Sequence, residues 1–334
     1  MEFGSVPLAQ ANGAILAHSV HLPCGGRLRK GMVLREADIA RIASAGLCEV
    51  TVARLGVGDV HEDAAALSLA QALVPDPMAA RLVLRPVGTG RVNIHADVTG
   101  VAEVLAVRVG AVNAIDPMIT VATVPEWQRM GQGDMVATVK IISYGVEGAA
   151  LHRACAAGHA ALRMRPVAIS DAVLIQTTVA GDDGEKGHRA LQQRLTTLGV
   201  TLRPKILVPH ETGALCAAIR AVADAGVVLI LTASATSDPH DVAPEALRRA
   251  GGSVARFGMP VDPGNLLFLG SLGHVPVIGL PGCVKSPALN GADWVMERVI
   301  CGVPVTSGDI AAMGVGGLLK EIPTRPHPRE KVRP

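Results

Sequence analysis

The stretch Val227-Val-Leu-Ile-Leu-Thr232, between Gly226 and the small-residue run Ala233-Ser-Ala-Thr236, decides the fold of the second half of the chain. An uninterrupted run of Val, Leu and Ile predicts a strand that is covered on both of its faces. Such strands are typical of parallel sheets, because parallel neighbours are joined by helices that pack on the sheet.

Strands and helices alternate on both sides of this stretch. The alternation predicts a three-layer α/β domain with a doubly wound, mostly parallel sheet. In its last helix we expect Ser286 at the N-cap and Pro287 at the first helical position. The expected elements are strands at 172–178, 201–208, 227–232, 254–258, 266–270 and 275–279, and helices at 185–198, 211–225, 244–250 and 287–300.

The first half of the chain has a different hydrophobic pattern, with short runs of alternating apolar and polar residues and few helical stretches. We expect an α+β, strand-rich domain over 1–165, the α/β domain over 166–303, and a C-terminal extension over 304–334. The extension ends in a Pro- and charge-rich tail that is predicted to be extended or disordered. The expected elements are strands at 14–20, 48–52, 92–96, 119–124 and 135–142, helices at 36–45 and 61–73, and a segment at 106–115 that fits either.

Composition excludes several classes of protein. Of the 334 residues, 49% are hydrophobic and only 2% aromatic, and the formal net charge is +2. The apolar share excludes intrinsic disorder for most of the chain. The few aromatic side chains and the small charge leave neither a stacking platform nor a basic field for nucleic acid.

No membrane or secretion signal is expected. The most apolar stretch, 215–233, is interrupted by Arg220 and Asp224, whereas a spanning helix needs about 20 apolar residues. The start lacks the features of a signal peptide, and the scattered cysteines form no Cys-x-x-Cys pair. We therefore expect a cytoplasmic protein.

The sequence also lacks the common nucleotide and metal signatures. It contains no G-x-x-x-x-G-K-[ST] loop, no complete dinucleotide fingerprint and no G-x-S-x-G elbow. His152, Cys155 and His159 have a spacing that could hold a metal, but no fourth ligand is near, so a helix face is the preferred reading. No metal site is predicted.

Three loops of the α/β domain could carry chemistry, namely 177–186, 232–241 and 279–286. Each follows a predicted strand, and open parallel sheets bind ligands outside the carboxyl ends of their strands. Small and hydroxyl-bearing residues let backbone N–H groups approach an anion. Together the loops predict a pocket for a phosphate-bearing ligand, although each alone could be a plain connection and Asp241 could only cap the next helix.

Three motifs in order along 170–302 resemble a known family. These are Asp241-Val-Ala-Pro-Glu-Ala246, Met259-Pro-Val-Asp-Pro-Gly-Asn265 and Val277-Ile-Gly-Leu-Pro-Gly282. They are similar to motifs of the molybdopterin-binding domain that molybdopterin adenylyltransferases and molybdopterin molybdenumtransferases share. The patch from Arg29 through Val52 also resembles the stretch that leads into this domain in molybdenumtransferases, but here a long segment separates this patch from the domain.

The resemblance implies molybdopterin, or its nucleotide form, as the ligand. Asp241 and Asp182 are the implied catalytic residues, which would position Mg²⁺, molybdate or a nucleotide group. Hydroxyls, lysines and turn residues of the three loops and of the Pro-Gly loop would hold the ligand. The implied ligand-binding residues are Thr177, Lys186, Thr232, Ser234, Thr236, Gly264, Asn265, Pro281, Gly282, Lys285 and Ser286.

The chain also departs from the family pattern. Ala233-Ser-Ala-Thr236 has no glycine where the family has a Gly-rich phosphate loop, and Cys283 replaces the usual Asn. Added Cβ atoms narrow the accessible backbone, so the phosphate would be held differently. Ligand binding is therefore expected to carry over better than catalysis.

Three functions remain open. The resemblance favours a protein of molybdenum cofactor biosynthesis, a transferase that inserts molybdate into adenylylated molybdopterin. The alternatives are a non-catalytic carrier or sensor of the cofactor, and an unrelated metabolite- or nucleotide-binding α/β protein. The resemblance further implies a homo-oligomer, with a nucleotidyltransferase or a molybdoenzyme-maturation protein as partner.

Overall fold

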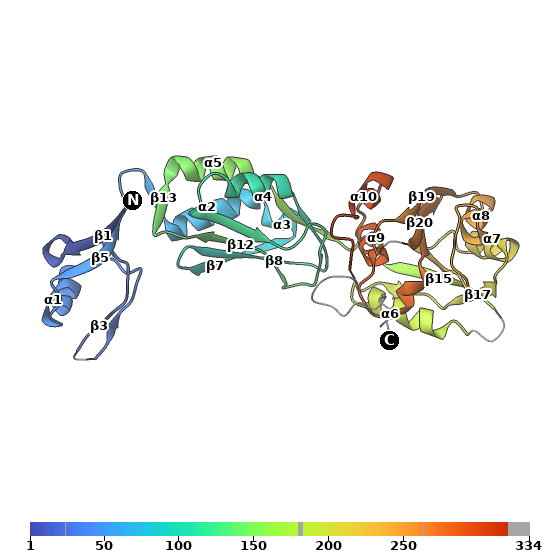
Figure 1. Cartoon of the computed structure of the whole chain (residues 1–334), viewed down its shortest axis with the longest axis horizontal. Helices are drawn as coiled ribbons and strands as arrows, with labels where there is room; N and C mark the ends of the chain where they lie inside the picture. Colours follow the sequence, from blue (N-terminus) through green and yellow to red (C-terminus); the bar gives the residue numbers. More distant parts are fainter. Residues whose placement is uncertain (24, 180–182, 263, 320–334) are drawn as a thin grey trace, which may run out of the picture. The chain divides into compact units, whose positions relative to one another are not determined.

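A computed structural model describes residues 1–23, 25–179, 183–262 and 264–319 (Figure 1). The chain divides into two compact units. Unit 1 comprises Met1–Val98 and Ala102–Met164, and unit 2 comprises Thr99–Val101 and the chain from Arg165 onward.

In the described part of the chain, unit 2 is built on a seven-stranded sheet. Its order is β16-β15-β18-β21-β20-β19, and β17 also pairs with β15. β15 is parallel to β16, β17 and β18, and β18 is parallel to β21, whereas β20 runs antiparallel to its two neighbours. The mostly parallel sheet is confirmed. The strands are β15 (Asp171–Thr178), β16 (Thr201–Leu202), β17 (Ile206–Pro209), β18 (Val227–Leu231), β19 (Ser253–Met259), β20 (Asn265–Leu272) and β21 (Val275–Leu280).

Helices cover both faces of this sheet (Figure 1). Successive side chains of a strand point to opposite faces. Accordingly Ala172 and Leu174 pack with α6, α9 and α10, while Val173 and Ile175 pack with α7 and α8. The predicted three-layer arrangement is therefore confirmed. The helices are α6 (Glu185–Thr196), α7 (Thr212–Ala221), α8 (Val242–Arg249), α9 (Gly291–Ile300) and α10 (Ser307–Ala312), with a 3-10 turn η2 (Gly282–Lys285).

The start of the last predicted helix was wrong. α9 begins at Gly291 rather than at Pro287, and Ser286 lies at the end of η2. The N-cap is Asn290, whose Oδ1 accepts from the Ala292 amide at 3.0 Å. Asp293 Oδ2 accepts from the Asn290 amide at 2.8 Å, which completes a reciprocal capping box. The helix therefore begins at the buried Asn290 cap and not at the exposed Ser286-Pro287 pair.

The strand predicted at 201–208 is also divided in two. β16 ends at Leu202 and β17 begins at Ile206. Pro204 lies between them and has no N–H for the ladder. As a result, two short strands flank one side of β15.

Unit 1 is α+β and strand-rich, as predicted. Segment 106–115, which fitted helix or strand, forms α4, and the strand expected at 14–20 is replaced by β2 and β3. The sheets have the orders β1-β5-β2, β10-β12-β8-β7, β11-β9-β14, β13-β6 and β3-β4. Their strands are β1 (Glu2–Pro7), β2 (Ile15–Leu16), β3 (Val20–His21), β4 (Arg27–Leu28), β5 (Glu49–Arg54), β6 (Asp59–His61), β7 (Leu82–Gly88), β8 (Arg91–Ala96), β9 (Gly100–Val104), β10 (Ile119–Thr123), β11 (Arg129–Met130), β12 (Met135–Ile141), β13 (Gly145–Glu147) and β14 (Leu162–Pro166). The helices are a 3-10 turn η1 (Leu8–Gln10), α1 (Glu36–Ser44), α2 (Glu62–Leu73), α3 (Pro77–Ala80), α4 (Ala106–Asn113) and α5 (Gly148–Gly158).

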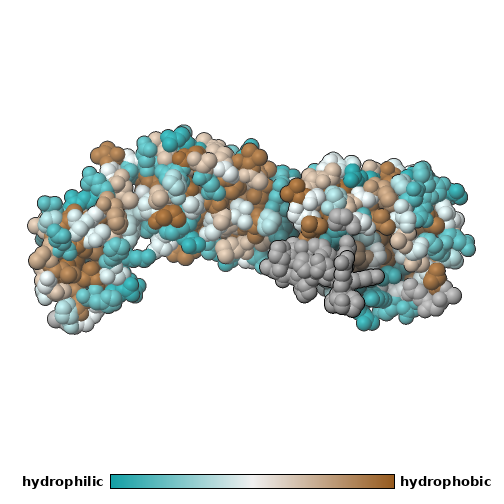
Figure 2. Space-filling view, viewed as in Figure 1, coloured by the Kyte–Doolittle hydropathy of each residue, from teal (hydrophilic) through white to brown (hydrophobic). Residues whose placement is uncertain are grey.

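The surface carries apolar side chains in several separate places. Figure 2 shows them among hydrophilic side chains on one face of each unit. The most exposed include Val57, Met78, Val107 and Val315. Across the described ranges, no helix combines the length and the apolar character that crossing a membrane requires.

Candidate functional site

The register of the sheet brings the predicted loops to one edge of unit 2. Gln176 of β15 lies opposite Leu231 of β18, and Leu231 lies opposite Leu280 of β21. Thr178 lies opposite Pro209 of β17. The chain therefore leaves four parallel strands at the same carboxyl edge, where open α/β sheets bind ligands.

A hydrogen-bonded chain of three side chains joins β15, β17 and β18 at this edge. Thr177 Oγ1 lies 2.8 Å from Nδ1 of His210, and Nε2 of His210 lies 3.0 Å from Oγ of Ser234. Thr177 Oγ1 also accepts from the Ala233 amide at 2.9 Å. Thr177 is buried and Ser234 is exposed, so this series of hydrogen bonds runs from the interior of the sheet to its edge.

The loop after β18 is folded by its own hydroxyls. Thr232 Oγ1 donates to the Ser234 carbonyl at 2.6 Å and lies 3.2 Å from Thr236 Oγ1, and both threonines are buried. Within the described ranges, no acceptor bonds the amides of Ser234, Ala235 or Thr236. Three consecutive N–H groups of this loop thus have no acceptor among the described residues.

The absence of glycine from this loop has a simple explanation. Ala233–Thr236 all lie in the described part of the chain, and none of them has a positive φ. Because the backbone stays in regions that any L-residue adopts, Cβ atoms bring no torsional strain. The loop therefore needs no glycine to adopt this backbone conformation.

Asp241, predicted as catalytic, is a helix cap in this structure. Its Oδ2 accepts from the Ser237 amide at 2.9 Å and its Oδ1 from the Val242 amide at 2.7 Å. The carboxylate thereby joins the β18 loop to the start of α8. A catalytic role for Asp241 stays a prediction, and Asp182 lies outside the described residues.

Two lysines that were predicted to bind the ligand line a separate cavity of about 430 Å³. Lys186 of α6 and Lys285 of η2 line it, together with Arg189, Asp183 and Glu185. Glu185 is paired with Lys205 at 3.0 Å, and this hydrogen bond lowers the pKa of Glu185. As far as the chain is described, neither Lys186 nor Lys285 is in an ion pair, so both charges are available to a ligand.

The remaining predicted residues support the site rather than open into it. Asn265 is buried, donates to Asn290 Oδ1 at 3.3 Å and accepts from the Leu267 amide at 3.2 Å. Asn290 also donates to Cys283 Sγ at 2.8 Å. Ser286 Oγ accepts from the Ala288 amide at 3.3 Å. Gly264 precedes β20 with φ +97°, while Pro281 and Gly282 lead from β21 into η2.

Sequence reasoning missed His210. It follows the strand β17 directly, so the rule that selected the other three loops applies to it equally. The signal that identifies His210 is its place just after the carboxyl end of a predicted strand. Arg189 was missed as well, since its helix was considered only for its apolar face.

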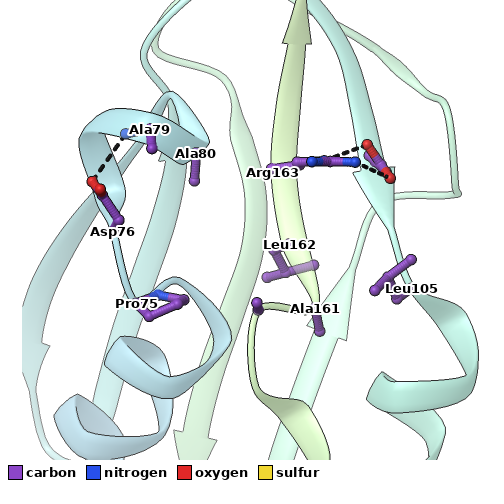
Figure 3. A pocket seen from close by; sticks show the side chains of 10 residues that line it. Pro75, Asp76, Ala79, Ala80, Leu105, Ala161, Leu162 and Arg163 are labelled. Carbon is purple, nitrogen blue, oxygen red and sulfur yellow. Dashed lines mark hydrogen bonds and ion pairs between the residues drawn. The ribbon is translucent and has the colours of Figure 1, made fainter.

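A second cavity, of about 350 Å³, lies in unit 1 (Figure 3). Its walls are largely apolar, with Pro75, Leu105 and Leu162 among them. On one side Arg163 donates to both carboxylate oxygens of Glu103, at 2.5 and 2.8 Å, and this pairing raises the pKa of Arg163. The described ranges hold no group of three His, Cys, Asp or Glu side chains that could bind a metal ion.

Comparisons with known protein families match two segments of the chain. Residues 167–299 match the family model described as a probable molybdopterin binding domain. Residues 5–54 match a domain of unknown function, DUF8806. No curated protein matches the chain.

Solved structures that resemble the chain do so at low identity. A molybdenum cofactor biosynthesis protein B is 14% identical, covering 40% of this chain and 88% of its own, with a TM-score of 0.30. The protein CinA of unknown function from Thermoplasma acidophilum is 16% identical, covering 40% and 98%, with a TM-score of 0.30. The molybdopterin biosynthesis moeA protein from Pyrococcus horikoshii OT3 is 11% identical, covering 91% and 76%, with a TM-score of 0.26. By the family match, residues 167–299 are a member of the molybdopterin-binding domain family.

Proposed function

We propose that unit 2 binds molybdopterin, or its nucleotide form, through the phosphate group, in the course of molybdenum cofactor biosynthesis. The observation that carries this proposal is the row of three amides, Ser234 to Thr236, that have no acceptor in the described ranges. They lie at the carboxyl edge of the sheet beside the Ser234 hydroxyl. Backbone amides at such an edge are a common means of holding phosphate.

The charge of the surroundings supports an anionic ligand. Both carboxylate oxygens of Asp241 are occupied by backbone amides. Lys186 and Lys285 lie on the elements that follow β15 and β21 at the same edge, and neither is neutralised within the described part of the chain. Aromatic residues make up 2% of the chain, so affinity for a pterin would depend on the phosphate rather than on ring stacking.

The finer role is proposed to be molybdate insertion by a transferase, with Mg²⁺ and molybdate as further components. A non-catalytic carrier is the second candidate. The engagement of Asp241 in capping favours the carrier, because a carboxylate that accepts two amide bonds has less capacity to hold a metal or oxyanion. A carrier needs only the binding site.

Binding is tested by retention of molybdopterin, measured as fluorescence of its oxidised pterin after gel filtration. We expect wild-type protein to retain it and Ala235→Asp to bind at least about tenfold more weakly, because a carboxylate would face the phosphate. Ala311→Asp, on the exposed face of α10, is the matched control. No retention by wild-type protein would refute the proposal.

The two roles are separated by a second assay. Purified protein, adenylylated molybdopterin, Mg²⁺ and molybdate are incubated together, and active cofactor is measured by reconstitution of a molybdoenzyme lacking it. Molybdate-dependent formation of cofactor supports the transferase. Retention without formation supports the carrier.

Location and assembly are proposed from the same family membership. We expect a cytoplasmic homo-oligomer that receives or delivers its ligand with a nucleotidyltransferase or a molybdoenzyme-maturation partner. Light scattering during gel filtration measures the oligomeric state. A monomer at micromolar concentration would contradict this part of the proposal.

A further inference from the structure

The hydroxyl of Thr177 lies inside unit 2, where its hydrogen-bonding choices are few. Thr177 is 2% exposed, and its Oγ1 already accepts from the Ala233 amide. A buried hydroxyl proton also needs an acceptor, because an unpaired polar group is costly in the interior. In the described ranges the partner available to it is Nδ1 of His210, at 2.8 Å.

This requirement fixes the tautomer of His210. If Nδ1 accepts the proton of Thr177, the neutral ring carries its own proton on Nε2. Nε2 then donates to Oγ of Ser234, 3.0 Å away. The proton of the Ser234 hydroxyl is consequently free to be donated elsewhere.

The opposite tautomer would have a different consequence. With the proton on Nδ1, Ser234 would donate to Nε2, as in a serine activated for nucleophilic attack. Thr177 would then accept twice, from Ala233 and from His210, and its own buried proton would have no acceptor among the described groups. The geometry therefore favours Ser234 as a donor rather than as a nucleophile.

We infer that His210 is a positioning residue of the anion site, which orients Ser234 so that its hydroxyl donates to the ligand phosphate. This inference rests on the proposed function. Ser234 is exposed, and its hydroxyl belongs to the residue that starts the row of free amides. One side-chain donor thereby joins three backbone donors, a set that suits an anion, whose oxygens accept hydrogen bonds, rather than a cation.

The tautomer is tested directly on the full chain. Long-range ¹H–¹⁵N correlations of ¹⁵N-histidine-labelled protein, with His210→Gln as the assignment control, distinguish protonated from unprotonated ring nitrogens. We expect the proton on Nε2 and not on Nδ1. A proton on Nδ1 would overturn the inference without the use of any ligand.

Binding variants test the consequence for the ligand. The side-chain oxygen of Asn can replace Nδ1 as acceptor for Thr177 but cannot reach Ser234, whereas the amide nitrogen of Gln can replace Nε2 as donor. We expect His210→Asn and Ser234→Ala each to weaken retention of molybdopterin about tenfold, and the double variant to be no weaker than either. His210→Gln should stay within about threefold of wild type.

The outcomes separate this inference from the proposed function. Failure of wild-type protein to bind molybdopterin refutes the function, and the inference with it. Wild-type affinity in His210→Asn, or multiplied losses in the double variant, overturns the inference alone. Thermal melts of each variant are recorded, because a merely structural role would destabilise the Asn and Gln variants alike and leave their affinities equal.

Discussion

Arg194 of α6 donates from Nε to Oδ1 of Asp293 on α9 over 2.6 Å, and the two side chains are only 11% and 8% exposed. The guanidinium also donates to the carbonyls of Ser286 and Ala288 at 2.7 and 3.2 Å. The second carboxylate oxygen of Asp293 accepts from the Asn290 amide. One buried ion pair therefore connects two helices and the turn between η2 and α9.

Replacing one partner of this pair should be far more damaging than replacing an exposed arginine. We expect Arg194→Leu to lower the free energy of unfolding of unit 2 by about 3–5 kcal/mol, because Asp293 would keep a buried charge without a partner. Urea unfolding is followed by fluorescence of Trp294 in a Trp127→Phe background, since the chain has two tryptophans.

Arg189→Leu is the control for that experiment. Arg189 lies on the same helix, is 72% exposed, and is 3.7 Å from Glu185. Removing the Arg189 side chain should lower the free energy of unfolding by less than about 1 kcal/mol, as for most surface ion pairs. A similar loss of unfolding free energy in the two variants would show that the Arg194–Asp293 pair does not stabilise the contact between α6 and α9.

Gly187 is required for the contact between α6 and the sheet. A Cβ at this position would lie 2.3 Å from Gln176 Oε1 and 2.6 Å from Leu231 Cδ2. Gln176 is itself buried and donates to the Gly184 carbonyl at 2.9 Å, so it has little room to move. We expect Gly187→Ala to destabilise unit 2 by about 1–3 kcal/mol in the same urea assay.

The matched control is Gly213→Ala near the start of α7. Nothing lies within 4 Å of a Cβ at that position. Alanine there should stabilise the helix by about 0.4–1 kcal/mol, because it restricts the unfolded chain and favours helix. A similar loss of stability in both variants would contradict this prediction, because the loss at Gly187 could then not be assigned to the contact with Gln176.

The fold of unit 2 could be predicted because its pattern is local. A run such as 227–231 is apolar throughout, and only burial on both faces accounts for it. The carboxyl-edge rule then selected Thr177, Thr232 and Ser234 from the strand ends alone. These predictions needed no knowledge of which residues meet.

The rest depends on contacts between distant segments. His210 is linked to Ser234 across 24 positions and to Thr177 across 33, and no periodicity reports such a meeting. The cap of α9 was misplaced because Ser286-Pro287 and Asn290 are both good local signals. What decides between them is the burial of Asn290 and its bond to Asn265, which the sequence does not display.

Substitutions of Asp241 can distinguish a helix-capping role from a catalytic role. Asp241→Ala should lose about 0.5–2 kcal/mol of stability, as loss of an N-cap does. Asp241→Ser, which keeps an acceptor at the N-cap, should recover most of that loss and retain molybdopterin as wild type does. If cofactor formation occurs in wild type and disappears in Asp241→Ser while retention is unchanged, the carboxylate has a catalytic role that capping does not explain.

Cys301 should make the protein sensitive to alkaline pH. Burial, and to a lesser extent Glu297, raises the pKa of its thiol to about 12. An unfolded cysteine ionises near pH 8.5, so the native state holds a proton that the unfolded state loses above that pH. The protonated thiol of Cys301 therefore makes its full contribution to the free energy of unfolding below about pH 8.5. This contribution is lost as the pH rises toward 12.

Alkylation provides the measurement. At pH 8.5 we expect iodoacetamide to modify the exposed Cys48 in native protein and to leave Cys301 unmodified until urea is added, as read by peptide mass spectrometry. Thermal melts should show a smaller decline between pH 8.5 and 11 for Cys301→Ala than for wild type, because the variant lacks the titrating group. Labelling of native Cys301 at the rate of Cys48 would mean that the thiol is reached, and ionises, without unfolding.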